Sequence, residues 1–485
     1  MNNVFEGLQP EKVWQYFGEI CNVPRPSKKE KLISDYIIGV ARRLNLEHET
    51  DEVGNILIRK PASSGFENIP TVVLQSHIDM VCEKNSDTYH DFENDPIIPR
   101  RDGEWIKATG TTLGADDGIG IATQLAILEA NDIEHGPLEM LFTIDEETGL
   151  TGAKGLKPGF LKGKVLLNLD SEDEGELFIG CAGGQDTKLF MNYSRVAVNF
   201  DFTGFQIRVS GLQGGHSGDD INKGRGNAVK ILNRLLWSSS HLFEIRLSEI
   251  DGGNLRNAIA REAYANIIVP NRFSNDFIQY VKKFNATLKQ EYRISEPSLL
   301  ISYQQTELPS FLIDLSTQDR LLNALYACPH GVIAMSADIP NFVETSTNLA
   351  SVKMNEKVIE IGTSQRSSSE HGKEDVVNMV ESVFRLAGAK IVHNDGYPGW
   401  TPNPKSPILD TTRKAYRKLF GNEPKVLAIH AGLECGLIGE QYPGIDMISY
   451  GSTIKGAHSP DERLEITTVQ KFWDLTLEVL KNIPR

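Results

Sequence analysis

The stretch TVVLQSHID, residues 71–79, decides the fold class, because a short aliphatic run leads directly into a histidine and an aspartate. Its apolar first half is typical of a strand buried in an α/β sheet. His77 stands where that strand would end. The carboxyl ends of strands in such a sheet lie along one rim, so residues distant in sequence can meet in one pocket. The stretch therefore predicts an α/β domain with a polar site at this rim.

Other candidate site residues follow outward from this stretch. Glu147 and Asp170 each come after an aliphatic run, as His77 does. Asp116 lies in a glycine-flanked turn that precedes a segment with apolar residues at helical spacing. His458 lies in a loop near the end of the chain. Two histidines and three carboxylates are a ligand set suited to a pair of divalent metal ions.

The five residues divide into two ion sites that share one carboxylate. Asp116 is expected to be the bridge, because its glycine-flanked turn allows close approach and one carboxylate can span ions about 3.5–4 Å apart. His77 and Asp170 would complete one site, and Glu147 and His458 the other. Taken singly, each residue has an ordinary explanation as a surface or loop residue. Their shared placement favours the metal centre.

Two more carboxylates have expected roles beside the ions. Asp79, two residues after His77, can accept a hydrogen bond from the second ring nitrogen and so fix the orientation of the imidazole. Glu146 is the expected general base, which takes a proton from a water and delivers it to a departing amine. The pattern predicts a binuclear metallohydrolase that cleaves an amide.

The order of elements predicts an interrupted catalytic domain. Strand-like and helix-like segments alternate over residues 1–186, which is the first part of this domain. Residues 187–392 contain strictly alternating, antiparallel-type strands and amphipathic helices, and we expect an inserted α+β domain, formed by two related halves without a convincing sequence repeat. The α/β signature returns over residues 393–485, the second part of the catalytic domain.

The composition excludes several classes of protein. The chain has 485 residues, 40% of them hydrophobic and 24% charged, and a formal net charge of −15. This charge argues against nucleic acid or an anionic membrane as a partner. No signal peptide is evident, and no run approaches the roughly 18 apolar residues of a membrane helix. The five scattered cysteines form no C-x-x-C pair, so we expect reduced thiols in a cytoplasmic protein.

The motifs, taken together and in this order, resemble a known enzyme family. It is the binuclear zinc peptidase family of carnosinases, aminoacylases and glutamate carboxypeptidases, and in particular its aminoacyl-histidine dipeptidase subfamily. The resemblance covers essentially the whole chain. It rests on DEVGNILIRKP (51–61), GTTLGAD (110–116), DSE (170–172), GCAGG (180–184), GGHSG (214–218) and HAGLECG (430–436).

The resemblance implies a fold and a set of roles. It implies a catalytic domain with a mixed sheet flanked by helices, and an inserted ferredoxin-like lid domain through which relatives form homodimers. The family's metal ligands fall on His77, Asp116, Glu147, Asp170 and His458. Its orienting aspartate falls on Asp79 and its base on Glu146, and a cis peptide is implied between Asp116 and Asp117.

The resemblance also assigns four residues to the substrate. His216 would stabilise the oxyanion, although from the residues alone its glycine-rich segment could be only a flexible turn. Asn257 and Arg366 would hold the C-terminal carboxylate of the substrate, although an isolated arginine is more often a surface residue. Gly432 would contribute backbone to the substrate pocket. One departure is Glu434, because the wider family often has an aspartate in this segment.

Three functions remain open from the sequence. The first is hydrolysis of unblocked dipeptides, including aminoacyl-histidine dipeptides such as β-alanyl-histidine. The second, in the same family, is deacylation of N-acyl amino acids or cleavage of tripeptides. The third is a metal-stabilised binding protein without turnover, which Glu146 argues against because a purely structural site needs no base. Zinc is the expected metal, with cobalt and manganese as alternatives that tolerate the same ligands.

Overall fold

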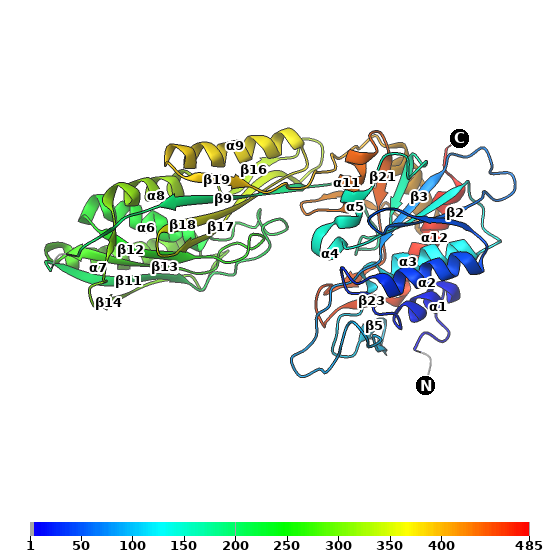
Figure 1. Cartoon of the computed structure of the whole chain (residues 1–485), viewed down its shortest axis with the longest axis horizontal. Coiled ribbons are helices and arrows are strands. Elements are labelled where there is room, and N and C mark those ends of the chain that lie inside the picture. The colour runs from blue at the N-terminus through cyan, green and yellow to red at the C-terminus, as the bar shows by residue number, and fades with distance from the viewer. Residues whose placement is uncertain (1–3, 199, 485) are drawn as a thin grey trace. The chain divides into compact units, whose positions relative to one another are not determined.

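The computed structural model describes residues 4–198 and 200–484 and divides into two compact units. One unit comprises the described residues of Met1–Gly180, Trp400–Ala428 and Leu433–Arg485, and the other comprises those of Cys181–Gly399 and Ile429–Gly432. Figure 1 shows the chain coloured from the N-terminus to the C-terminus, with its helices and strands labelled. The predicted boundaries, after residues 186 and 392, lie a few residues from the observed divisions, and the assignment of residues 429–432 to the second unit has no counterpart among them.

The first unit is built on an eight-stranded mixed sheet. Its strand order is β1-β2-β6-β3-β7-β21-β8-β20. The central strands β6, β3, β7 and β21 run parallel to one another, whereas β2 is antiparallel to β6 and β8 is antiparallel to β21. All six residues of both β3 and β6 are buried, as expected for strands covered on both faces. The strands are β1 (Glu47–Thr50), β2 (Ile56–Lys60), β3 (Val72–His77), β6 (Leu138–Thr143), β7 (Val165–Asn168), β8 (Glu176–Cys181), β20 (Lys425–Ile429) and β21 (Asp446–Ser449).

Helices cover both faces of this sheet. Gln75 of β3 hydrogen-bonds with Glu434 of one helix, whereas the next residue, Ser76, hydrogen-bonds with Gln124 of another. Because successive strand residues point to opposite faces, these two helices, α11 and α3, lie on opposite sides of β3. The helices of the unit are α1 (Glu11–Ile20), α2 (Lys31–Arg43), α3 (Ala115–Glu129), α4 (Glu146–Gly149), α5 (Thr151–Gly155), α10 (Pro407–Phe420), α11 (Glu434–Gln441) and α12 (Ile466–Lys481).

Local sequence explains where several helices begin and end. Helix α10 starts with Pro407 in its first turn, and the Ser406 hydroxyl accepts the backbone N–H of Leu409. It ends at Gly421, whose φ of +75° is a conformation that glycine adopts at little cost. A small sheet in the order β22-β23-β5-β4 completes the first unit. Its strands are β4 (Pro99–Asp102), β5 (Trp105–Ala108), β22 (Ile454–Lys455) and β23 (Arg463–Glu465).

The second unit contains a nine-stranded antiparallel sheet. Its order is β14-β11-β13-β12-β17-β18-β9-β19, with β16 paired to β17 beside this row. The strands are β9 (Gly183–Asn192), β11 (Phe202–Ser210), β12 (Arg246–Gly252), β13 (Ala263–Pro270), β14 (Leu300–Thr306), β16 (Gly331–Met335), β17 (Val343–Met354), β18 (Val358–Ser367) and β19 (Lys390–His393). The pair β10 (Arg195–Val196) and β15 (Leu312–Ile313) forms a separate two-stranded sheet.

The second unit consists of two halves with the same topology. The first half runs β11-α6-β12-β13-α7-β14, with strand order β14-β11-β13-β12. The second half uses β9, α8, β17, β18, α9 and β19 in the mirrored order β17-β18-β9-β19. Each is a βαββαβ ferredoxin-like motif, as the resemblance implies. The helices are α6 (Ala228–Phe243), α7 (Ser274–Glu291), α8 (Leu315–Ala327) and α9 (Glu370–Leu386), and η1 (Asn271–Phe273) precedes α7.

One apolar core joins these two halves. The helices contact one another in the order α7-α6-α8-α9 and pack on the sheet, and Phe205, Phe277 and Phe384 are fully buried between the layers. Side chains cap α6, α8 and α9 at their N-termini; for example, Asn227 accepts N–H groups from the first turn of α6. Among the described residues, no helix is both long and apolar enough to cross a membrane.

Candidate metal centre and substrate-binding residues

Three of the predicted ligands lie at the carboxyl ends of adjacent parallel strands. His77 is the last residue of β3, Glu147 lies in α4 directly after β6, and Asp170 follows β7. Because β6, β3 and β7 are neighbours in the sheet, their ends share one rim. Asp116 reaches this rim from the start of α3, and His458 from the loop between β22 and β23. The structure therefore brings the five side chains of the first unit together.

The five side chains form two groups that share Asp116. The ligand atoms of His77, Asp116 and Asp170 lie within 4.8 Å of one another, and so do those of Asp116, Glu147 and His458. In the first group, His77 Nε2 is 3.1 Å from Asp116 Oδ1 and 3.3 Å from Asp170 Oδ1. In the second, His458 Nε2 is 3.4 Å from Asp116 Oδ2 and 3.1 Å from Glu147 Oε2. The two oxygens of Asp116 thus face different groups.

This donor set fits a pair of divalent metal ions. Each group offers one imidazole nitrogen and carboxylate oxygens, which are the atoms that zinc-type ions bind. Glu147 Oε1 is buried and lacks a hydrogen-bond partner, so it has an unused acceptor position at the centre. A carboxylate with one oxygen toward each group is the arrangement that bridges two ions. The residues present could therefore hold both ions.

Asp79 lies behind the His77 ring. Its Oδ1 is 3.4 Å from His77 Nδ1, while its two oxygens accept the backbone N–H groups of Glu146 and Glu147 at 3.0 and 3.2 Å. The Ser27 hydroxyl donates to Asp79 Oδ2 at 2.7 Å. Burial acts to raise the pKa of Asp79, but the contacts with His77, Ser27 and the backbone outweigh it and lower the pKa to about 2. Asp79 is therefore an ionised partner for the imidazole.

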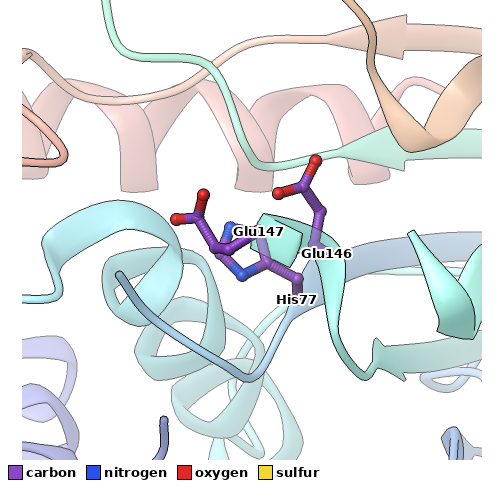
Figure 2. Close-up of side chains that lie close together, drawn as sticks. All are labelled: His77, Glu146 and Glu147. Atoms are coloured by element: carbon purple, nitrogen blue, oxygen red, sulfur yellow. The ribbon is translucent and has the colours of Figure 1, made fainter. Parts of the chain in front are cut away.

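Glu146 and Glu147 are neighbours with different surroundings. Figure 2 shows their carboxylates pointing to different sides of the view, with the His77 ring close to both. Burial raises the pKa of Glu146 well above its ordinary value, and the negative charges of Asp170 and Glu147 act in the same direction. Glu146 has no place in either of the groups that share Asp116. Glu146 therefore lies beside the two ligand groups, and its carboxylate can hold a proton.

Two buried residues clamp the loops of this centre, and neither was singled out from the sequence. Glu462 accepts the backbone N–H groups of residues 113–116 at 2.7–3.3 Å, so it holds the loop that carries Asp116. Arg25 donates to the carbonyls of Ile78 and Asp79, and also to that of Gly114. The closeness of Glu462 to His458 in sequence was its only signal. The peptide bond between Asp116 and Asp117 is cis, as the resemblance implies.

His216 lies in the second unit, in a loop between β11 and α6. Its backbone N–H donates to Asp220 Oδ2, and its Nδ1 accepts the N–H groups of Gly218 and Asp219. Because Asp219 Oδ2 also lies 3.3 Å from Nδ1, these contacts allow a proton on either ring nitrogen. Glu296 accepts N–H groups of residues 213 and 226 on either side of the loop. The glycine-rich segment is therefore an anchored loop rather than a free turn.

The other predicted substrate residues lie in the same unit. Arg366 of β18 donates from Nη1 to the Tyr397 hydroxyl at 3.0 Å, while its buried Nε has no partner. Gly432 lies against the ring of Tyr397, since a Cβ at this position would come within 2.9 Å of it. Asn257 is exposed, and its backbone carbonyl accepts the N–H of Ser217, the residue after His216.

His430 is a further buried polar residue of this region, and no role was assigned to it from the sequence. Its Nε2 is 2.7 Å from the Ser346 hydroxyl, and Ser346 is the strand partner of Arg366. Burial lowers the pKa of His430 to about 4, and the positive charge of Arg366 adds to this effect. Because Asp219 and His216 also act on its pKa, these residues share one electrostatic environment within the second unit.

Comparison with known proteins gives the family. The model of peptidase family M20/M25/M40 matches residues 73–482. The chain belongs to this peptidase family. The peptidase is 45% identical over 477 residues to the cytosol non-specific dipeptidase of Escherichia coli (strain K12), and the match covers 98% of each chain.

Solved structures agree with this assignment. A crystal structure of the aminoacylhistidine dipeptidase from Vibrio alginolyticus is 44% identical, has a TM-score of 0.94, and covers 99% of the peptidase and 98% of that chain. An aminopeptidase from Bacillus cereus has a TM-score of 0.58 at 16% identity, covering 99% of the peptidase and 100% of that chain, and supports the fold alone. The predicted fold class, the mixed α/β architecture of a zinc-peptidase-like protein, is confirmed.

Proposed function

We propose that this peptidase hydrolyses unblocked dipeptides, including aminoacyl-histidine dipeptides such as β-alanyl-histidine. The proposal is supported by two relatives that match nearly the full length at 44–45% identity and are named as dipeptidases. The observation that carries the chemistry is the placement of Asp116, whose two oxygens face separate groups of ligand atoms. Two divalent ions fit this arrangement, and zinc is our first assignment, with cobalt and manganese as alternatives.

The ligand roles follow from the two groups. We assign His77 and Asp170 to one ion, Glu147 and His458 to the other, and Asp116 to both. When bound, the ions lower the pKa of a water and polarise the substrate carbonyl. The remaining steps belong to residues of the chain itself.

Glu146 carries the proton in this proposal. Its carboxylate takes a proton from the attacking water, holds it while the carbon–nitrogen bond breaks, and delivers it to the leaving amine. The raised pKa of the buried carboxyl suits this task, because the protonated form is stable enough to persist between the two transfers. Asp79 holds the His77 ring in orientation through Nδ1, as ionised carboxylates do behind metal-binding histidines.

The second unit supplies the proposed substrate contacts. His216 is assigned to the negative oxygen that develops on the carbonyl, with Nε2 as the proposed donor. Arg366, with its unpartnered Nε, is assigned to the C-terminal carboxylate of the dipeptide together with Asn257. Gly432 would present its backbone to the substrate. The proposal that this unit acts as a lid rests on the resemblance and on these residues.

Location and assembly are also proposals. A cytoplasmic location is supported by the name of the Escherichia coli relative and by the five scattered cysteines, which form no C-x-x-C pair. The net charge of −15 disfavours nucleic acid and anionic membranes as partners. A homodimer through the second unit is the assembly that the resemblance implies, and light scattering of the purified peptidase tests it.

A substrate panel tests the proposed activity. The protein is stripped with a chelator, reloaded with zinc, cobalt or manganese, and assayed on free dipeptides, tripeptides and N-acetyl amino acids. We expect hydrolysis of free dipeptides, including β-alanyl-histidine, and little or no hydrolysis of the other two classes. Hydrolysis of acetylated amino acids without cleavage of free dipeptides would replace the proposal with a deacylase, and metal binding without any turnover would replace it with a binding protein.

A further inference from the structure

A buried polar residue stands behind each strand end that carries part of the candidate centre. Gln75 precedes His77 by two residues on β3, Asn168 precedes Asp170 by two, and Thr143 is the last residue of β6 before Glu146 and Glu147. Gln75, Asn168 and Thr143 are all 0% exposed. Polar side chains in the interior of a sheet are costly unless they are hydrogen-bonded. These three neighbouring side chains therefore need hydrogen-bond partners inside the sheet, just below the rim.

That partner is Glu434 at the start of α11. Its Oε2 accepts from Gln75 Nε2 at 2.6 Å and from the Thr143 hydroxyl at 2.7 Å. Gln75 Nε2 also reaches Thr143 Oγ1 at 3.1 Å, and Gln75 Oε1 accepts from Asn168 Nδ2 at 2.6 Å. One connected network thus spans β6, β3 and β7 and ends on a single carboxyl group that is 0% exposed.

The strand register puts this network on the same side of the sheet as the His77 side chain. Residues two apart on a strand point to the same face, so Gln75 and His77 share one face. Asn168 is the strand partner of Gln75, and Thr143 is the strand partner of His77. The network therefore forms the layer directly beneath the imidazole, between the metal-binding rim and the apolar centre of the sheet.

We propose that Glu434 is a positioning residue for the metal centre, which sets the relative placement of the three strand ends through Gln75, Thr143 and Asn168. The inference rests on the proposed binuclear site. A residue that only packed α11 on the sheet could be apolar, whereas Glu434 Oε1 and Asn168 Oδ1 are buried without partners, which is a cost to stability. The network would compensate for this loss of stability by strengthening metal binding, because metal affinity depends strongly on residues that orient the ligands.

A pair of matched variants tests this role. Glu434→Ala removes the acceptor of the network, and Glu139→Ala removes another buried glutamate of the same sheet. Glu139 lies near the opposite end of β6, where its Oε2 accepts the backbone N–H groups of Lys162 and Gly163 at 2.9 and 3.0 Å. Glu434→Ala loses two hydrogen bonds to a buried carboxyl group, and Glu139→Ala loses three, because Arg59 Nε also donates to Glu139 Oε1 at 3.3 Å. The control therefore removes at least as many hydrogen bonds, but only Glu434 lies beneath the rim.

The measurement is zinc affinity by competition with a chromogenic chelator, together with the thermal midpoint of the metal-free protein and the separate kcat and KM for a dipeptide. We expect Glu434→Ala to weaken zinc binding by about 10- to 100-fold and to lower kcat with little change in KM. Glu139→Ala should lower the thermal midpoint and keep the wild-type zinc affinity. Glu434→Gln, which keeps an oxygen acceptor for Gln75 and Thr143, should restore most of the affinity.

The possible outcomes distinguish a failure of the positioning role from a failure of the proposed function. Wild-type zinc affinity in Glu434→Ala, or an equal loss in both alanine variants, overturns the positioning role while leaving the metal site in place. A wild-type protein that binds no metal overturns the proposed function itself. If Glu434→Ala fails to fold, Gln75→Met removes the centre of the same network at similar side-chain volume. We expect the same loss of zinc affinity and kcat from this variant.

Discussion

The two units keep their candidate functional residues in different ways. In the first unit, His77 is 1% exposed and lies at the end of a fully buried parallel strand, and buried side chains hold the loops around it; His458, on a loop, is the exception at 56% exposed. In the second, the His216 side chain is 32% exposed and is held in a loop beside an antiparallel sheet. Metal binding needs ligands fixed before the ion arrives. Substrate contacts must instead admit a molecule and release its products, so a more exposed loop suits them.

The comparison separates residues that determine metal content from residues that determine turnover. We expect substitutions of the first unit's ligands to remove ions, whereas substitutions in the second unit should leave the ions in place and slow the reaction. The proposed base, Glu146, is an exception, because it lies in the first unit but its substitution should affect turnover alone.

The largest effect is expected for Asp116→Ala. The variant removes the carboxylate that both ligand groups share, so we expect zinc content to fall below one ion per chain and activity to fall below detection. The measurement is metal content after dialysis, with dipeptide hydrolysis as the second readout. Asp446→Ala is the control, because Asp446 begins a parallel strand of the same sheet and its side chain accepts hydrogen bonds from the start of α10 rather than facing the ligands. An Asp116→Ala protein that keeps two ions would break the comparison.

Glu146→Gln should remove turnover and keep the ions. Loss of a general base costs about 10²- to 10⁴-fold in kcat, and the amide leaves the ligand groups unchanged. Its neighbour gives the control, since Glu147→Gln should lose an ion as well as activity. Metal content and kcat measured on the two variants separate the roles. Equal metal loss in both variants would mean that Glu146 is a ligand rather than the base.

His216→Ala tests the second unit. Removing a donor to the developing oxyanion costs about 10²- to 10³-fold in kcat. Zinc content should stay at the wild-type level, because the residue belongs to the other unit. Lys223→Ala, which alters an exposed side chain of the same loop, should leave kcat unchanged. If His216→Ala lost metal and activity in parallel, the separation of the two units' tasks would be wrong.

A smaller effect concerns stability against pH. An unfolded histidine titrates near pH 6.5, whereas burial lowers the pKa of His430 to about 4. Between these values the unfolded chain binds more protons, so His430 lowers the stability of the fold as the pH falls. We expect His430→Gln to lose roughly 2 kcal/mol less than the wild type between pH 7.5 and pH 5. Urea denaturation at the two pH values measures this difference, and identical losses in both proteins would contradict it.

Four of the five metal-type residues carry a local signal in the sequence, whereas His458 lies in a loop without one. An aliphatic run ends at His77, another precedes Glu147, and a glycine-flanked turn surrounds Asp116. Parallel strands that carry such residues at their ends place them on one rim, and the structure brings these side chains together as expected. His216 and Arg366 lack such signals, so their roles came from the resemblance alone.

The residues that hold the centre in place could not be predicted from the sequence. Arg25 and Glu462 bind backbone groups far away in the chain, and Glu434 meets Gln75 only when α11 packs on the sheet. Backbone partners leave no pattern in the sequence. These contacts become visible only in three dimensions.

The duplication of the second unit was also hidden, because the first half is inserted between β9 and α8 of the second. The second half is therefore not continuous in the sequence, and a search for a repeat compares the wrong segments. The predicted boundary after residue 186 falls inside β9, because β9 begins at Gly183, two residues after β8 of the first sheet ends at Cys181.

Anomalous diffraction from a zinc-loaded crystal would locate the two ions. We expect two zinc peaks about 3.5–4 Å apart, one on each side of the Asp116 carboxylate. The peak beside His77 and Asp170 should be distinct from the peak beside Glu147 and His458. A single peak, or two peaks that do not share Asp116, would contradict the account.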